Sequence, residues 1–224
     1  MTEPTLPGVH VRVLPVDETE ADQSALSPDE RQRAARFAFA ADRRQYVTAH
    51  GMARSLIAEL LGADPAGLRF AAGGGKPRLI EPAVADLDLS LSHAAGIAAC
   101  AVSFGGLIGI DVEPLARRVA PRVARRFLAT DEAAWLEARP PECRPEDFLA
   151  LWTLKEAFAK ALGLGIQVGF GRFSLRPDPP RAIHLPREAG AARAWRFAQW
   201  RPTPLHVAAL AWRDGLCGER LGKV

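Results

Sequence analysis

Alternating apolar and polar residues predict several short strands along the chain. Over 9–16 valines alternate with polar side chains, which is the two-residue period of a half-buried strand. Over 87–92 leucines alternate with an aspartate and two serines, and the runs 97–102 and 107–112 are mostly apolar. We expect these three runs to be adjacent strands of one buried sheet, and the segment 168–212 to hold further short strands separated by proline-containing turns.

Helix signals lie between these strands. The sequence Ser-Pro-Asp-Glu at 27–30 combines an N-cap residue, a proline at the first helical position and a capping-box glutamate, so a helix is predicted to begin there. Three longer helices are predicted over 42–61, 121–138 and 146–162, and a glycine follows the first and the last of them.

The composition is that of an ordinary folded protein. The chain has 224 residues, of which 48% are apolar and 25% charged, so extensive disorder is excluded. The formal net charge is only +3, which is too balanced to indicate a nucleic-acid-binding protein. Lysine occurs only at positions 76, 155, 160 and 223, so an interior lysine indicates a need for a compact ammonium group in a chain that otherwise uses arginine.

The three cysteines have no spacing typical of a disulfide framework or a zinc site, so free thiols are expected. The first residues lack the basic and apolar regions of a signal peptide, and no apolar stretch approaches the length of a transmembrane helix. We therefore expect a cytoplasmic protein without membrane association.

Two acids two residues apart are the first candidate site. Asp111 and Glu113 lie on a predicted strand, so both carboxylates point to the same face. Their repulsion would be relieved by a cation, and paired carboxylates together with substrate phosphate oxygens suit Mg²⁺. The alternative is a strand end with two solvent-exposed acids.

A second candidate is a stripe on the predicted helix 146–162. Trp152, Glu156 and Lys160 follow a four-residue spacing and therefore share one helix face, while leucines and a phenylalanine suit the core-facing side. The alternative is an ordinary surface ion pair between Glu156 and Lys160, because the glutamate precedes the lysine by four residues.

Two short motifs have the properties of phosphate-binding turns. Ser92 and His93 lie where a predicted strand meets a turn of small residues, and Lys76 follows a run of glycines. A serine nucleophile with His93 as its base is disfavoured, because adjacent strand residues point to opposite faces and the GxSxG pattern is absent from the sequence. The glycine run also lacks the spacing of a P-loop.

Four segments, in this order, resemble motifs of the Sfp-type 4′-phosphopantetheinyl transferases. They are GGGKPRL at 73–79, LSLSHAAG at 89–96, IGIDVEPL at 108–115 and FLALWTLKEAFAKALGLGI at 148–166. The resemblance spans roughly residues 27 to 170, and the last two motifs together are highly specific.

The resemblance implies a cytoplasmic, Mg²⁺-dependent enzyme that transfers the 4′-phosphopantetheine arm of coenzyme A to a serine of an apo acyl carrier or peptidyl carrier protein. The other product would be 3′,5′-ADP. The implied fold is α+β, with two similar α/β subdomains in a pseudo-twofold arrangement, an N-terminal one over 1–106 and a C-terminal one over 107–224. Such a chain would act as a monomer, since it supplies both halves.

The resemblance also implies roles for single residues. The metal ligands would be Asp111, Glu113 and Glu156, and the catalytic residues Glu156, as general base, and Lys160. Three positions depart from the family pattern: Glu30 stands where some members have a base, His50 where many have arginine, and Ala71 where some have arginine before the glycine–lysine–proline motif. The residues implied to contact coenzyme A are Arg33, His50, Arg54, Gly75, Lys76, Ser92, His93, Lys155 and Lys160.

A basic stretch after the metal motif could bind the carrier protein. The segment 114–130 contains no acidic residue, and a basic face would orient the acidic helix that carrier proteins of this kind present. The alternative is a solvated helix face. The candidate docking residues are Arg117, Arg118, Arg122, Arg125 and Arg126.

Two other functions use the same residues. A different Mg²⁺-dependent phosphotransferase or nucleotide hydrolase would turn over ATP and ignore coenzyme A. A non-catalytic paralogue would bind coenzyme A or a carrier protein without transferring anything.

Overall fold

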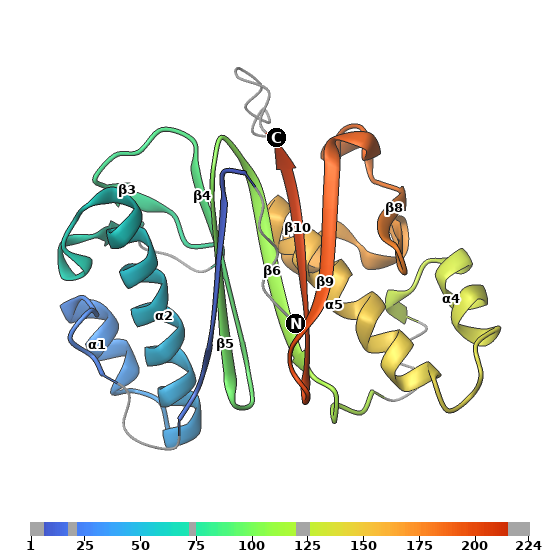
Figure 1. Cartoon of the computed structure of the whole chain (residues 1–224), viewed down its shortest axis with the longest axis horizontal. Helices are drawn as coiled ribbons and strands as arrows, with labels where there is room; N and C mark the ends of the chain where they lie inside the picture. Colours follow the sequence, from blue (N-terminus) through green and yellow to red (C-terminus); the bar gives the residue numbers. More distant parts are fainter. Residues whose placement is uncertain (1–6, 18–21, 72–74, 120–125, 215–224) are drawn as a thin grey trace.

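The computed structural model describes residues 7–17, 22–71, 75–119 and 126–214. Figure 1 shows two antiparallel sheets side by side at the centre of the molecule, with a long helix on the outer side of each. The molecule therefore has four layers, helix, sheet, sheet and helix, and its class is α+β as predicted. No helix in the described ranges has both the length and the apolar character of a membrane span.

The first half of the chain builds one sheet and its helices. The sheet has the order β1-β5-β4, and helix α2 packs against its outer face through apolar side chains that include Met52, Leu56 and Ile57. A hairpin of two short strands follows α2. The elements are β1 (Val9–Pro15), α1 (Pro28–Ala34), α2 (Ala40–Leu61), β2 (Arg69–Phe70), β3 (Leu79–Glu81), β4 (Leu87–Ala94) and β5 (Ile97–Phe104).

The second half repeats this plan. Its sheet has the order β6-β10-β9, and α5 packs on the outer face with Leu154, Phe158 and Ala161 in the core beneath it. The hairpin of β7 and β8 lies beside α5 and β9. The elements are β6 (Gly106–Pro114), α4 (Thr130–Glu137), α5 (Arg144–Leu162), β7 (Ser174–Pro177), β8 (Pro180–His184), β9 (Trp195–Thr203) and β10 (His206–Asp214).

The helix ends follow the signals in the sequence. Ser27 caps α1 with Glu30 completing the capping box, and Gly62 and Gly163 end α2 and α5 in left-handed conformations. The helix predicted over 121–138 is interrupted: Arg126 and Phe127 are helical, but α4 begins only at Thr130, because Ala129 is extended and its N–H donates to the Glu132 side chain. Residues 121–125 of that prediction lie outside the described residues.

The prediction that 87–92, 97–102 and 107–112 form adjacent strands of one sheet is correct for β4 and β5 and wrong for β6, which belongs to the second sheet. Side chains rather than backbone ladders join the two sheets along the edge where β4 meets β6. Three polar side chains of β4, spaced two residues apart, accept hydrogen bonds from alternate N–H groups of β6, which satisfies that strand edge. The pairs of this side-chain ladder are Asp88 with Ile108 at 2.8 Å, Ser90 with Ile110 at 3.1 Å, and Ser92 with Val112 at 3.2 Å.

A glycine sets the spacing between β6 and α5. A Cβ added to Gly109 would lie 2.0 Å from the Ala157 carbonyl oxygen and 2.4 Å from the Ala161 nitrogen. These are backbone atoms, so a rotamer change cannot relieve the clash, and only glycine allows the helix to lie this close to the strand. The close approach brings Asp111 on β6 within hydrogen-bonding distance of Lys160 on α5.

Candidate functional site

A cavity of about 300 Å³ lies where β4, β6 and α5 meet. The stripe predicted on the helix lines one side of it, with Trp152, Glu156 and Lys160. The structure thus brings together all three acids proposed from the sequence and the lysine proposed to act with them. The polar and aromatic residues of the lining are Ser92, His93, Asp111, Glu113, Arg117, Trp152, Glu156 and Lys160.

Asp111 is buried at the floor of this cavity, where it is 4% exposed. Its Oδ1 atom accepts hydrogen bonds from Lys160 Nζ at 2.7 Å and from Ser92 Oγ at 2.9 Å. Its other oxygen, Oδ2, is buried with no hydrogen-bond partner among the described residues. An unpaired buried carboxylate oxygen is costly, so this atom needs a partner that the described residues do not provide.

The three acids repel one another. Burial and the nearby Asp111 raise the pKa of Glu156 to about 7, although Lys160 opposes the shift. Burial and Asp111 likewise raise the pKa of Glu113, and Arg117 opposes that shift. Mutual repulsion of carboxylates in one partly buried cavity is the condition that a bound cation relieves.

These donors fit a divalent ion in chemistry, although a ready-made group of three metal-ligating side chains is not formed among the described residues. One oxygen of Glu113 already has partners within the protein, because its Oε1 atom accepts from Trp152 Nε1 at 3.0 Å and pairs with Arg117. The unpartnered oxygen of Asp111 and the repulsion among hard oxygen donors both favour a Mg²⁺-type cation over a neutral ligand.

A larger cavity of about 720 Å³ lies against α1, α2 and β4. Leu91 and His93 line both cavities. Lys76 from the larger cavity and Lys160 from the smaller one both line a third space of about 440 Å³. Among the residues predicted to bind coenzyme A, the larger cavity collects Arg33, His50, Arg54, Gly75, Lys76 and His93.

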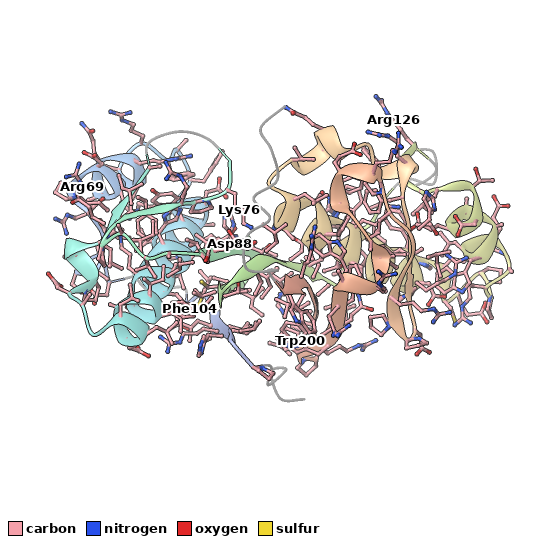
Figure 2. The ribbon with its side chains drawn as sticks, turned by 90° about the horizontal axis from the view of Figure 1, so that it is seen from above. Arg69, Lys76, Asp88, Phe104, Arg126 and Trp200 are labelled. Atoms are coloured by element: carbon pink, nitrogen blue, oxygen red, sulfur yellow. The ribbon has the colours of Figure 1, made fainter. Side chains whose placement is uncertain are left out.

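Lys76 lies at the junction of the two halves. Its ammonium group pairs with Asp88 on β4 and donates to the Ala161 carbonyl oxygen on α5 at 3.2 Å (Figure 2). Asp88 was missed by sequence reasoning, although its place in the alternating pattern of 87–92 put it on the same strand face as Ser90 and Ser92.

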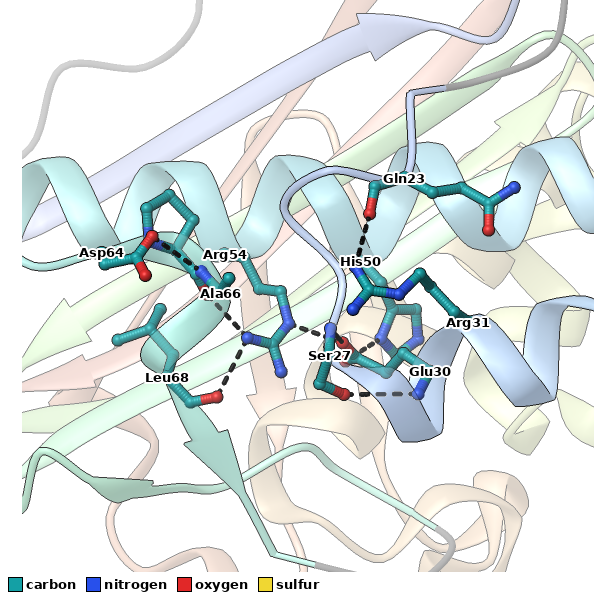
Figure 3. A network of polar contacts seen from close by, with 10 residues as sticks. Gln23, Ser27, Glu30, Arg31, His50, Arg54, Asp64, Ala66 and Leu68 are labelled. Carbon is teal, nitrogen blue, oxygen red and sulfur yellow. Dashed lines mark hydrogen bonds and ion pairs between the residues drawn. The ribbon is translucent and has the colours of Figure 1, made fainter.

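Glu30 holds a charged network at one wall of the larger cavity (Figure 3). Arg54 is 2% exposed, pairs with Glu30 through Nε, and donates through Nη1 to the carbonyl oxygens of Pro65 at 2.6 Å and Leu68 at 2.9 Å. His50 Nδ1 lies 3.1 Å from the other Glu30 oxygen. The guanidinium of Arg54 is therefore largely committed to internal partners, which argues against the predicted direct contact with coenzyme A.

The Glu30 network predicts a loss of stability in acid. Burial raises the pKa of Glu30, but His50, the Ser27 N–H and Arg54 together outweigh it and hold the pKa at about 2, below the ordinary value of 4.5. The folded-state pKa is depressed, so its contribution of about 3 kcal/mol is complete above about pH 4.5 and is lost as the pH falls towards 2.

Chemical denaturation of the wild type and of Glu30→Gln between pH 7 and pH 2 tests this. Glutamine can keep the capping hydrogen bond to the Ser27 N–H, so the variant should mainly lose the pH-dependent part of the stability. Glu142→Gln, a change at an exposed acid, is the control and should follow the wild type. Parallel curves for the wild type and Glu30→Gln would contradict the prediction.

Lys155 does not belong to the site, which corrects the prediction that it binds coenzyme A. Its side chain is fully buried, pairs with Glu132 of α4 and donates to the Phe173 carbonyl oxygen at 2.8 Å. Glu132 Oε1 also accepts from the Leu175 N–H at 2.8 Å. The rare lysine is explained by this interior ion pair, which ties α4, α5 and β7 together.

The five arginines proposed for docking differ in where the structure places them. Arg117 pairs with Glu113 and lies over the Trp152 ring at 5.3 Å, so it belongs to the cavity with the acids. Arg118 and Arg126 are exposed. Arg122 and Arg125 lie outside the described residues.

Comparison with known proteins gives a consistent result. Residues 107–211 match the family model of the 4′-phosphopantetheinyl transferase superfamily. The 4′-phosphopantetheinyl transferase HetI of Nostoc sp. is 34% identical over 91% of this chain and 86% of its own length. A 4′-phosphopantetheinyl transferase of Bacillus subtilis is 32% identical and the Sfp enzyme of Bacillus subtilis strain 168 is 30% identical, each over 80% of both chains. The chain therefore belongs to the 4′-phosphopantetheinyl transferase superfamily and is a transferase of that class.

Proposed function

We propose that this enzyme transfers the 4′-phosphopantetheine arm of coenzyme A to the serine hydroxyl of an apo acyl carrier or peptidyl carrier protein, requires Mg²⁺ and releases 3′,5′-ADP. The observation that carries the proposal is the cavity in which Asp111, Glu113, Glu156 and Lys160 converge, beside a larger cavity whose lining holds more basic than acidic residues. A diphosphate bridge would lie in the first and the nucleotide phosphates in the second.

The larger cavity supports the binding of a nucleotide with several phosphate groups. Apart from Arg54, which is committed to internal partners, its positively charged or ionisable groups from the predicted set are Arg33, His50, Lys76 and His93, and Gly75 allows close approach of a ligand to the backbone. Glu30 neutralises part of this charge. Ser92 and Lys160 line the adjoining acidic cavity, where they would meet the diphosphate.

Asp111, Glu113 and Glu156 would hold the Mg²⁺ ion together with oxygens of the diphosphate. The ion, when bound, neutralises phosphate charge and polarises the phosphorus that is attacked. Arg117 and Trp152 hold Glu113 by its Oε1 atom, so they would control its orientation. Ser92 and Lys160 hold Asp111 in the same way, by its Oδ1 atom.

The transfer step needs one base and one cation from the chain. The Glu156 carboxylate would take the proton of the carrier serine, either directly or through a water molecule. The serine oxygen then bonds to the pantetheine-side phosphorus, and the bond from that phosphorus to the bridging oxygen breaks. Lys160 would stabilise the charge on that oxygen, which leaves with 3′,5′-ADP.

One assay separates this function from its alternatives. The protein is incubated with coenzyme A, Mg²⁺ and an apo carrier protein, and the carrier is examined by intact-mass spectrometry for one phosphopantetheinyl adduct. A chelator should prevent the adduct, and added Mg²⁺ should restore it. Hydrolysis of ATP without carrier modification would favour the other phosphotransferase, and coenzyme A binding without transfer would favour a non-catalytic paralogue.

We propose that the carrier docks on the basic stretch after β6. Arg118→Glu combined with Arg126→Glu should raise the KM for the carrier by about fivefold and weaken its dependence on salt, because exposed charges steer an acidic partner. Arg187→Glu, a change at an exposed arginine outside this stretch of the sequence, is the control. An unchanged carrier KM would remove these residues from the docking site.

The proposal also covers the location of the enzyme in the cell and its oligomeric state. We propose a cytoplasmic enzyme that acts as a monomer, with halves divided at 106 and 107, where β6 begins. A single chain already contributes β4 from the first half and β6 with α5 from the second to one cavity.

A further inference from the structure

The two ends of the side-chain ladder share a feature that its middle lacks. At each end, the oxygen that accepts a β6 N–H also accepts an ammonium proton: Ser92 Oγ accepts Lys160 at 2.9 Å, and Asp88 Oδ2 accepts Lys76. The middle residue, Ser90, accepts the Ile110 N–H, and neither lysine is hydrogen-bonded to it in the described part of the chain.

Lys76 depends on Asp88 for its position. The lysine comes from the turn before β3, and its side chain is 16% exposed while that of Asp88 is 22% exposed. Two of its three ammonium protons are directed to Asp88 and to the Ala161 carbonyl oxygen, which leaves one for a ligand. Figure 2 shows the two side chains pointing toward one another between the halves of the molecule.

Asp88 also favours the charged form of this lysine. Burial lowers the pKa of Lys76, and the carboxylate of Asp88 opposes that shift. Because the same oxygen accepts the Ile108 N–H at 2.8 Å, the ammonium is fixed relative to β6, the strand that carries Asp111 and Glu113. A flexible side chain whose position is fixed before binding loses less conformational entropy when the ligand arrives.

We propose that Asp88 is a positioning residue for coenzyme A, which holds the Lys76 ammonium at the junction of the larger cavity and the space lined by Lys160. The proposal rests on the proposed function, in which Lys76 meets a phosphate of coenzyme A. In this role Asp88 does not need to contact the ligand. Through Asp88, the position of the Lys76 ammonium depends on β6, the strand that carries Asp111 and Glu113.

A double-mutant cycle on the dissociation constant for coenzyme A, measured by calorimetry without carrier protein, tests this inference. Asp88→Asn keeps an acceptor for the Ile108 N–H but loses the charge, so it should fold and weaken binding by about fivefold to tenfold. Lys76→Met should weaken binding at least as much. In the Lys76→Met background, Asp88→Asn should have almost no further effect, since it acts only through the lysine.

Ser90→Ala is the matched control, because it removes a comparable ladder contact that involves no lysine. It should lower the melting temperature, and its effect on coenzyme A binding should be small and equal in both backgrounds. Thermal unfolding of each variant separates stability from affinity. Should Asp88→Asn alone fail to fold, the double variant, which loses both charges, is compared with Lys76→Met instead, and a further loss of affinity there contradicts the inference.

The outcomes are distinguishable. If Asp88→Asn weakens binding equally with and without Lys76, or does not weaken it, Asp88 merely joins the strands and the inference is wrong. If Lys76→Met leaves the dissociation constant unchanged, the proposed phosphate contact is wrong and the inference fails with it. If the wild type binds coenzyme A but does not modify a carrier, the proposed transfer fails while the cycle still reports on Asp88.

Discussion

Asp111→Asn is expected to lower kcat/KM for carrier modification by about a thousandfold while the protein stays folded. Asparagine has the same shape and can still accept from Lys160 and Ser92, so the hydrogen bonds at Oδ1 persist. What is lost is the negative charge and the second carboxylate oxygen, which is buried with no partner among the described residues. Initial rates of adduct formation, with circular dichroism to verify folding, measure the effect.

Glu156→Gln is the companion variant and is expected to be comparably inactive, because it removes both the proposed base and a proposed ligand. Glu142→Gln replaces an exposed acid that does not line the cavity and should retain wild-type rates. Near-normal turnover of Asp111→Asn or Glu156→Gln would mean that the role proposed for that residue is wrong.

Lys155→Met is expected to lower the free energy of unfolding by about 3–5 kcal/mol, because it leaves the Glu132 carboxylate buried without its cation. Both side chains of this pair are fully buried, so solvent cannot screen the loss. The ammonium also lies 4.3 Å above the Phe173 ring and donates to the backbone of that residue, and these contacts would be lost as well. Denaturant unfolding followed by fluorescence gives the difference.

Pairing this change with Glu132→Gln supplies the control. The double variant removes both charges, so it should be less destabilised than the sum of the two single changes. Coenzyme A affinity in the folded Lys155→Met protein should equal that of the wild type. A stable Lys155→Met variant with weakened coenzyme A binding would restore the original prediction that this lysine contacts the ligand.

The fold was predictable wherever the signal is local. The capping box at Ser27 and Glu30, the glycine stops at Gly62 and Gly163, and the alternation over 87–92 each depend on residues close in sequence, and the structure confirms them. The break before Thr130 in the helix predicted over 121–138 was missed because it depends on Glu132, whose carboxylate binds residues of α5 and β7 that no local pattern reveals.

The helical period of α5 predicted correctly which of its side chains line the cavity. The family motif, taken over residue by residue, added Lys155, which does not line it. Trp152, Glu156 and Lys160 share a face because of their spacing, and they line one cavity. Lys155 is five residues from Lys160, a rotation of about 140° on a helix, so the two ammonium groups cannot share that face. The spacing therefore argued against a contact between Lys155 and coenzyme A. The prediction followed the family motif instead.

Contacts between distant segments explain the remaining differences. Glu30 was recognised as a departure from the family pattern, but its partners Arg54 and His50 come from another helix. Asp88 was visible as one polar residue in an alternating strand, whereas its bond to β6 and to Lys76 depends on how the two sheets meet. Only the tertiary structure supplies that information.

The two-residue period of the side-chain ladder makes β4 intolerant of changes in length. One residue inserted before Asp88 would rotate every following side chain to the opposite face, as a shift of one position does in any strand. Leucines would then meet the edge of β6, three amide protons would lose their acceptors, and both lysines would lose their hydrogen-bond partners on β4. Variation in length within this family should therefore concentrate in the loops and avoid this strand.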